Sequence, residues 1–257
     1  MPGRAFDPDD DRVFIKTGPP AALTMFEAEA DGLRELRSAN VIRVPEVIDC
    51  GIFDGESYLA IERLQLEPAT ASVERSFGQQ LAALHRQVSD RFGWFRDNTI
   101  GLTFQRNTPG DDWVDFFRAH RLGAQLELAA VNGHGGELQG LGARLMEELP
   151  ALFLDYEPVA SLLHGDLWAG NWGNVAGEPV IFDPAVYYGD RESDIAMTML
   201  FGGFGKEFYD AYAASWPMKP GHERRIRLYQ LCHVLNHLNL FGRSYLGQAL
   251  QLIRAVL

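Results

Sequence analysis

The hydrophobic pattern of the chain changes near residue 65, and this change restricts the folds that the chain can adopt. Up to that point, short apolar segments surround one stretch of helical periodicity at 23–37. Beyond it, apolar residues recur at helical spacing over long segments. The strands predicted for the first part are 4–6, 12–16, 44–48 and 58–61, with turns at 7–11 and 51–55. The helices predicted for the second part cover 77–88, 138–149 and 226–257, and a strand at 162–163 and a hairpin at 173–182 lie between them.

This pattern predicts an α+β protein with two lobes and a cleft between them. The small, β-rich N-terminal lobe is expected over residues 1–64 and the larger, helical C-terminal lobe over residues 65–257. A chain of 257 residues, 46% of them hydrophobic, is long enough to bury a core of that size.

Composition narrows the partners and the location of the protein. A formal net charge of −12 argues against binding to nucleic acid or to an acidic membrane, because both require basic patches. The first residues are polar, unlike a signal peptide, and no apolar run is long enough to span a membrane. Two cysteines, Cys50 and Cys232, fit a reducing compartment. We therefore expect a cytoplasmic protein, and the sequence does not indicate its oligomeric state.

The strongest motif is HGDLWAGN at 164–171, which is followed by IFDP at 181–184. Asp166 and Asn171 have the spacing of the kinase pattern H-x-D-x-x-x-x-N, and Asp183 follows after the predicted hairpin. Phosphoryl transfer needs a carboxylate to accept the proton of the attacking hydroxyl, and oxygen ligands for Mg²⁺. A loop of four residues lets Asp166 face the acceptor while Asn171 turns back toward the metal, and the hairpin returns Asp183 to the same metal.

The motif and three later tracts resemble the signatures of fructosamine kinases, which are related to aminoglycoside phosphotransferases within the protein-kinase-like superfamily. The later tracts are 183–197, 200–204 and 235–242, and the resemblance runs from about Arg12 to the end. It implies an ATP- and Mg²⁺-dependent kinase that phosphorylates a sugar hydroxyl of small or protein-bound ketosamines, and so a role in deglycation.

The same resemblance implies roles for individual residues. Asp166 is expected to be the catalytic base, with Asn171 and Asp183 as the metal ligands. His164 and the buried Asp194 are expected to support the catalytic loop. The family leads us to expect histidine at position 190, where this sequence has Asp190, and this difference puts a substrate-side or loop contact in doubt.

The nucleotide half of the site is expected in the small lobe. The segment VFIK at 13–16 resembles the kinase strand that ends in the phosphate-binding lysine, so Lys16 is expected to reach the phosphates and Phe14, on the same face of the strand, to cover the adenine. Glu29 lies on the apolar stripe of the predicted helix and Glu27 does not, so Glu29 is the predicted partner of Lys16. The segment IERL at 61–64 looks like the adenine-binding hinge, where Glu62 and Leu64 are candidate contacts.

Trp168 and two histidines have a structural as well as a functional interpretation. The ring of Trp168 either forms a platform under the acceptor sugar or wedges the loop against the helical lobe. His233 and His237 are four residues apart on a predicted helix, but the apolar residues around them favour packed or capping histidines over metal ligands.

Three functional alternatives remain open in the sequence. The resemblance implies an earlier strand and a Gly-rich loop over the phosphates, whereas only Pro2-Gly3-Arg4 precedes Ala5-Phe6, so the small lobe is expected to lack them or to continue upstream. The chain is then either an active ketosamine kinase or a non-catalytic nucleotide-binding pseudokinase. A third alternative keeps the chemistry and changes the acceptor to an aminoglycoside, choline or homoserine. The presence of all the expected site residues favours an active enzyme, and Trp168 and the tract after Asp183 favour ketosamines.

Overall fold

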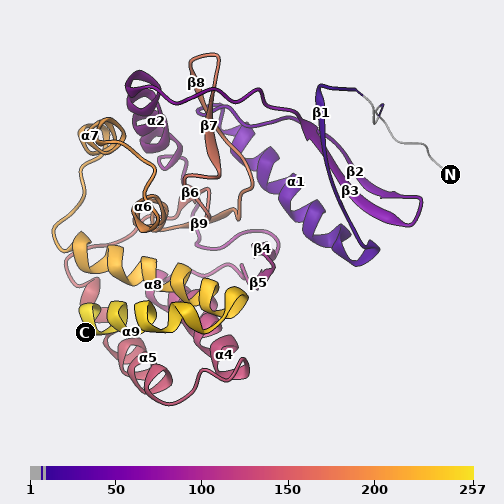
Figure 1. Cartoon of the computed structure of the whole chain (residues 1–257). Coiled ribbons are helices and arrows are strands. Elements are labelled where there is room, and N and C mark those ends of the chain that lie inside the picture. The colour runs from indigo at the N-terminus through magenta and orange to yellow at the C-terminus, as the bar shows by residue number, and fades with distance from the viewer. Residues whose placement is uncertain (1–6, 8–9) are drawn as a thin grey trace.

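The small lobe is a three-stranded antiparallel sheet covered by one long helix. In the computed structural model, which describes residue 7 and residues 10–257, the chain runs through β1 (Val13–Gly18), α1 (Leu23–Ser38), β2 (Val47–Phe53) and β3 (Glu56–Glu62). The sheet order is β1-β3-β2, and α1 packs on β2 and β3 (Figure 1). Five consecutive residues of β3 are buried, because Leu59 and Ile61 pack in the core with α1, and Tyr58 and Ala60 pack with β1 residues.

Two boundaries in this lobe differ from the prediction, and one predicted strand cannot be assessed. The strand predicted at 44–48 begins only at Val47, and the turn predicted at 51–55 is confined to Asp54 and Gly55. These two residues have φ angles of 51° and 82°, the left-handed conformation that a two-residue hairpin turn requires, so the strands continue up to them. The predicted strand at 4–6 lies outside the described residues.

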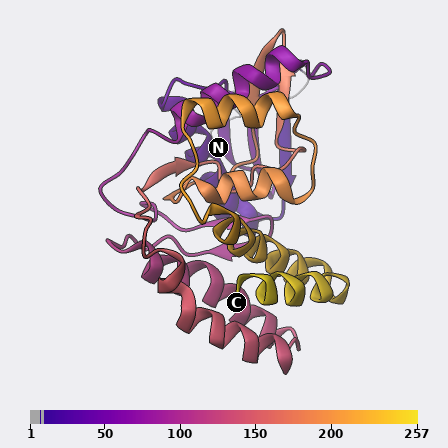
Figure 2. The ribbon, with the colours of Figure 1, turned by 90° about the vertical axis from the view of Figure 1, so that its left-hand side faces the viewer.

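The second lobe is mainly helical (Figures 1 and 2). Its helices are α2 (Ala71–Leu84), α3 (Trp113–Phe117), α4 (Gly123–Val131), α5 (Glu137–Glu148), α6 (Glu192–Leu200), α7 (Lys206–Ser215), α8 (His222–Phe241) and α9 (Leu246–Val256). Its strands pair as β4 (Asn98–Ile100) with β5 (Thr103–Gln105), β6 (Ser161–Leu163) with β9 (Tyr187–Gly189), and β7 (Trp172–Val175) with β8 (Glu178–Ile181). The predicted strand at 162–163 and the predicted hairpin at 173–182 are both present.

Two predicted helices have bounds that differ from those in the structure. The helix predicted at 77–88 begins earlier and ends at Leu84, because the chain then turns so that Val88 bridges to Ser161 of β6. The helix predicted at 226–257 is divided into α8 and α9 at Gly242, which has a φ angle of 89°. Helix α8 is buried on most sides and packs against α4, α6 and α9, so it forms the centre of the helical lobe.

Contacts between the lobes fix α1 relative to the strands that carry the site. Gly32 of α1 lies so close to Pro184 and Val186 that an added Cβ would be 3.2 Å from a methyl carbon of Val186. The hydroxyl of Tyr188 donates to Oε1 of Glu35 over 2.7 Å. One apolar core runs through both lobes, from Leu33 and Leu59 to the residues of α8. No helix within residues 10–257 has the length and apolar character needed to cross a membrane.

Candidate active site

The loop between β6 and β7 contains the HGDLWAGN motif, and a carboxylate beneath it fixes its backbone. Asp194 lies in the first turn of α6 and is 1% exposed. Its Oδ2 accepts the N–H of His164 at 2.8 Å, and its Oδ1 accepts the N–H of Gly165 at 2.9 Å. Gly165 has a φ angle of 84°, and a Cβ at this position would lie 2.0 Å from the carbonyl oxygen of Ala185, so only glycine fits there.

A second layer of buried side chains orients Asp194. Nε2 of His85 lies 3.2 Å from Oδ2 of Asp194, and Nδ1 of His85 lies 2.8 Å from the hydroxyl of Tyr212. Burial lowers the pKa of His85, so its ring is neutral at pH 7, donates to the carboxylate and accepts from Tyr212. Burial alone would raise the pKa of Asp194, but the hydrogen bonds and charges around it hold that pKa below its ordinary value.

His164 connects the loop to the segment after β8. Its Nε2 lies 2.9 Å from the carbonyl oxygen of Phe182, which can only accept, so Nε2 carries the proton. Its Nδ1 is then free to accept the N–H of Asp166, 3.3 Å away. Burial lowers the pKa of His164, in agreement with this neutral form. The imidazole therefore ties the segments that carry Asp166 and Asp183 to each other.

The carboxyl group of Asp166 has a strongly shifted proton affinity. Burial, together with the charges of Asp194 and Asp183, raises the pKa of Asp166 to about 7. A carboxylate with this pKa is a far better proton acceptor than an exposed aspartate, and it is still largely ionised just above neutral pH.

Asn171 and Asp183 present oxygen atoms next to Asp166. The side-chain Nδ2 of Asn171 donates to the carbonyl oxygens of Asp166 and Asp183, at 2.9 and 3.3 Å. The amide nitrogen is thus directed at the backbone, and the amide oxygen is left for another partner. Asp183 adopts a φ angle of 57°, an uncommon conformation outside glycine that is found at functional sites.

Lys16 of β1 lies between two acidic side chains. Its Nζ is 2.6 Å from Oε1 of Glu29 and 2.7 Å from Oδ1 of Asp183. Burial acts to lower the pKa of Lys16, but the two carboxylates outweigh it and raise that pKa, so the lysine is charged. The predicted pair of Lys16 with Glu29 is present, whereas Glu27 is half-exposed and lies 3.9 Å from Arg96.

These side chains line a single cavity of about 320 Å³ between the lobes, which we call the interlobe cavity. The predicted residues that it brings together are Lys16, Glu29, Asp166, Trp168, Asn171 and Asp183. The arrangement combines one cation, oxygen donors and a carboxylate with a raised pKa in one place, which suits the transfer of a charged group to a hydroxyl.

The other predicted nucleotide contacts lie outside the interlobe cavity. Phe14 is 42% exposed, and the guanidinium of Arg63 lies 5.7 Å from its ring centroid. Glu62, at the end of β3, accepts from Nη2 of Arg43 over 2.6 Å, so its side chain is engaged within the protein. Leu64 is half-buried just beyond β3.

Asp190 contributes to the core and to no substrate-facing surface. It is fully buried, and its carboxylate accepts the hydroxyls of Tyr156 at 2.8 Å and Tyr229 at 2.6 Å. Nε1 of Trp113 in turn donates to the hydroxyl of Tyr229. Asp190, which stands where the family leads us to expect histidine, is therefore held in a buried network of hydrogen bonds and does not face the substrate.

A second cavity, of about 410 Å³, adjoins the first along Gly101, Asp166 and Trp168. Apart from Asp166 and Asn236, its side chains are apolar or aromatic, and we call it the aromatic cavity. Its aromatic lining is Trp168, Phe201, His237, Phe241 and Tyr245. The ring of His237 contacts those of Phe201, Phe241 and Tyr245, whose centroids lie 4.9–5.4 Å from its own.

Sequence reasoning did not find this aromatic wall. It interpreted His237 as a packed or capping residue, and its Nδ1 does bond to the carbonyl oxygen of His233 at 2.8 Å, while its ring faces the cavity. The tracts at 200–204 and 235–242 were the available signal, because both stood out as family signatures. Trp168 is 42% exposed on both cavities, which fits a platform better than a buried wedge.

Comparison with known proteins places the chain among ketosamine kinases. A model of the fructosamine kinase family matches residues 3–257. A protein of Synechocystis sp. that is named a probable ketoamine kinase is 44% identical over 250 residues, which cover 96% of this chain and 84% of that protein. The chloroplastic protein-ribulosamine 3-kinase of Oryza sativa subsp. japonica is 40% identical over 254 residues, covering 97% of this chain and 74% of the relative.

Solved structures share the fold. A protein described as a fructosamine-3-kinase from Haemophilus somnus 129PT is 32% identical and superposes with a TM-score of 0.87, covering 95% of this chain and 83% of its own. An aminoglycoside phosphotransferase at 17% identity has a TM-score of 0.65 over 95% of this chain and 86% of its own, which is a likeness of fold alone. The small sheet lobe and the helical lobe are therefore those of a protein-kinase-like fold.

Proposed function

Because the chain belongs to the fructosamine kinase family, we propose that it transfers the γ-phosphate of ATP to a sugar hydroxyl of a ketosamine. Residues 1–64 form the nucleotide-binding lobe in this proposal, and residues 65–257 form the catalytic and acceptor-binding lobe. The consequence is deglycation of the amine that carries the sugar.

The observation that carries the choice of acceptor is the lining of the aromatic cavity. Among the described residues that line it, one is a carboxylate, Asp166, none is a lysine or arginine, and five have aromatic rings. A ketosamine has one ammonium group and a sugar with an apolar face, and aromatic rings bind both. An aminoglycoside carries several ammonium groups and would need several carboxylates here, so the lining favours a ketosamine.

The interlobe cavity suits the Mg²⁺-bound phosphates of ATP. Asp183 and the amide oxygen of Asn171 are hard oxygen donors of the kind that Mg²⁺ binds together with phosphates and water. Bound there, the ion would neutralise charge on the phosphate oxygens. Lys16, which is charged and positioned by Glu29, would bind the phosphates. Phe14 and the backbone near Glu62 and Leu64 are proposed to border the adenine.

The residues of the chain itself perform three tasks in the transfer. Trp168 and the aromatic wall hold the sugar, and Asp166 orients the attacking hydroxyl and removes its proton. The hydroxyl oxygen then bonds to the γ-phosphorus as the bond from that phosphorus to the oxygen of ADP breaks. His164 and Asp194 hold the loop in the geometry that these steps need, and precise alignment supplies most of the rate enhancement in such reactions.

An ATP-consumption screen across ketosamines, aminoglycosides, choline and homoserine tests this function. We expect turnover with fructose- or ribulose-derived adducts and none with the other three classes. Turnover of an aminoglycoside without turnover of any ketosamine would contradict the choice of acceptor. Binding of ATP without turnover of any acceptor would favour a non-catalytic nucleotide-binding protein.

Replacing Asp183 with asparagine is expected to weaken Mg²⁺-dependent nucleotide binding by about 10–100-fold, because a charged metal ligand becomes neutral. Calorimetric titration of ATP with Mg²⁺ and with a chelator measures this effect. The difference from the wild type should disappear in the chelator. Asp111→Asn, which changes an exposed aspartate paired with Arg91, is the matched control and should bind like the wild type. Equal loss of affinity with and without Mg²⁺ would remove Asp183 from the metal site.

A further inference from the structure

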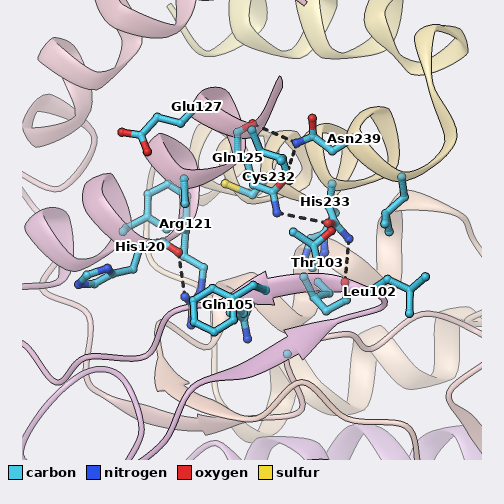
Figure 3. A pocket seen from close by; sticks show the side chains of 18 of the residues that line it. Leu102, Thr103, Gln105, His120, Arg121, Gln125, Glu127, Cys232, His233 and Asn239 are labelled. Atoms are coloured by element: carbon cyan, nitrogen blue, oxygen red, sulfur yellow. Dashed lines mark hydrogen bonds between the residues drawn. The ribbon is translucent and has the colours of Figure 1, made fainter. Parts of the chain in front are cut away.

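A third cavity, of about 560 Å³, lies behind the catalytic loop between β4–β5, α4 and α8 (Figure 3). Gly165, which precedes Asp166, lines it, and Asn236 and Leu240 line both this cavity and the aromatic cavity. The two spaces thus adjoin next to the catalytic loop. None of the roles described above uses this third space, which we call the arginine cavity.

The arginine cavity contains a buried cation without a counter-charge. Arg121 is 7% exposed, and its guanidinium lies 3.9 Å from the ring centroid of Tyr187. Its Nη atoms donate to neutral oxygens, namely the carbonyls of Arg106 and His120 and Oδ1 of Asn107. The side chain of Tyr187 is a further hydrogen-bond partner of Arg121 and is also neutral. Within residues 7 and 10–257, no carboxylate lies within ion-pair distance of Arg121, and its buried Nε has no hydrogen-bond partner. A buried charge in this state is costly, and an anion would relieve the cost.

The other polar side chains that line the cavity close to Arg121 are uncharged. Burial lowers the pKa of His120 and, to about 4, that of His233, and it raises the pKa of the Cys232 thiol to about 12. Thr103, also buried, has a hydroxyl without a partner in the described chain. Glu127 is exposed on α4, and its carboxylate points outward in Figure 3. The charge of Asp97 acts on Arg121 from farther away, and its Oδ1 accepts the N–H of Asn107.

The local backbone also marks this position. Arg121 lies in the π-helical turn Arg118–Leu122 between α3 and α4. π-Helical turns are rare in proteins, and those that do occur often lie at functional sites. Gly123 follows the turn, and a Cβ there would lie 2.5 Å from the carbonyl oxygen of Arg118, so the sequence accommodates this unusual geometry.

We propose that the arginine cavity binds a carboxylate on the amine-side substituent of the acceptor, with Arg121 as its counter-charge. The inference rests on the proposed function and makes it more specific: the preferred acceptor is a low-molecular-weight ketosamine of an amino acid. The sugar occupies the aromatic cavity, and the substituent passes Asn236 and Leu240 toward Arg121. Thr103 lines the same cavity, and its hydroxyl, which has no partner in the described chain, adds a hydrogen-bond donor there.

Paired acceptors that differ in one charge test the inference. Fructose adducts of ω-amino acids with one to five methylene groups are compared with the adducts of the corresponding amino amides, and kcat/KM is measured for each. At the chain length that reaches Arg121, the carboxylate should exceed the amide by about 10–100-fold, the value expected for a hydrogen-bonded charged group. Ketosamine turnover with no carboxylate preference at any length would overturn the inference and leave the proposed function intact. No ketosamine turnover would contradict the proposed function itself.

Variants of α4 and of Arg121 locate the preference in the arginine cavity. Ala124→Phe fills the space without removing a contact of Arg121, and it should bring the carboxylate-to-amide ratio close to one. Ala130→Phe makes the same change on the exposed side of the helix and should keep the wild-type ratio. Arg121→Met should also remove the preference, but Arg121 additionally supports the loop at 106–107, so its folding is checked by circular dichroism. A ratio that survives in Ala124→Phe would place the carboxylate elsewhere and contradict the inference.

Discussion

Asp166→Asn is expected to lower kcat by about 10²–10⁴-fold, the usual contribution of a general base. The substitution preserves the shape of the side chain and removes its ability to take the proton of the acceptor hydroxyl. ATP binding should remain nearly unchanged, because in the proposed mechanism Asp166 acts on the acceptor and not on the nucleotide. Steady-state kinetics with a ketosamine, together with calorimetric titration of ATP, measure the two effects. A variant that kept more than about a tenth of the wild-type kcat would exclude Asp166 as the base.

The raised pKa of Asp166 gives the same assignment a second test. Because the base must be ionised, kcat/KM of the wild type should rise with pH through about 7.

The folded-state pKa of Asp166 lies above the ordinary value of 3.8, so the stability that this group contributes is present below pH 4 and is lost as pH rises through about 7. Asp166→Asn removes this loss, and its melting temperature relative to the wild type should therefore be higher at pH 8 than at pH 4.

Asp194→Asn is expected to destabilise the protein by about 3–5 kcal/mol. The substitution replaces one carboxylate oxygen by an NH₂ group, which cannot accept the hydrogen bonds that buried donors now make to that oxygen. The N–H groups of His164 and Gly165 and the ring of His85 all direct hydrogens at Asp194. An amide oxygen can satisfy only part of this set, and the remaining donors would be left without a partner in the core.

Denaturant unfolding measured by tryptophan fluorescence checks this value. Asp210→Asn is the matched control, because Asp210 is exposed and pairs with Lys206 one helical turn away. It should change the free energy of unfolding by at most about 0.5 kcal/mol. Equal effects of the two substitutions would show that the buried network does not stabilise the catalytic loop.

The sequence by itself determined the features that depend on short spacings. The loop at 164–171 carries Asp166 and Asn171 at a fixed separation, and the hairpin behind it returns Asp183 to the same place. The partner of Lys16 followed from helical periodicity, since Glu29 and not Glu27 lies on the inward side of α1. The two-lobed fold followed in the same way from the change of hydrophobic pattern near residue 65.

Only the tertiary structure decided which distant side chains meet. Several contacts join segments that are far apart in the chain, and no local period encodes them. Examples are the pairing of Glu62 with Arg43, the burial of Asp190 beneath two tyrosines, and the aromatic rings around His237. The uncompensated charge of Arg121 is of the same kind. In the sequence it is one of many arginines. Its environment exists only once α4, α8 and β5 enclose it, because burial, and the lack of a carboxylate partner within the described part of the chain, are properties of the packed molecule.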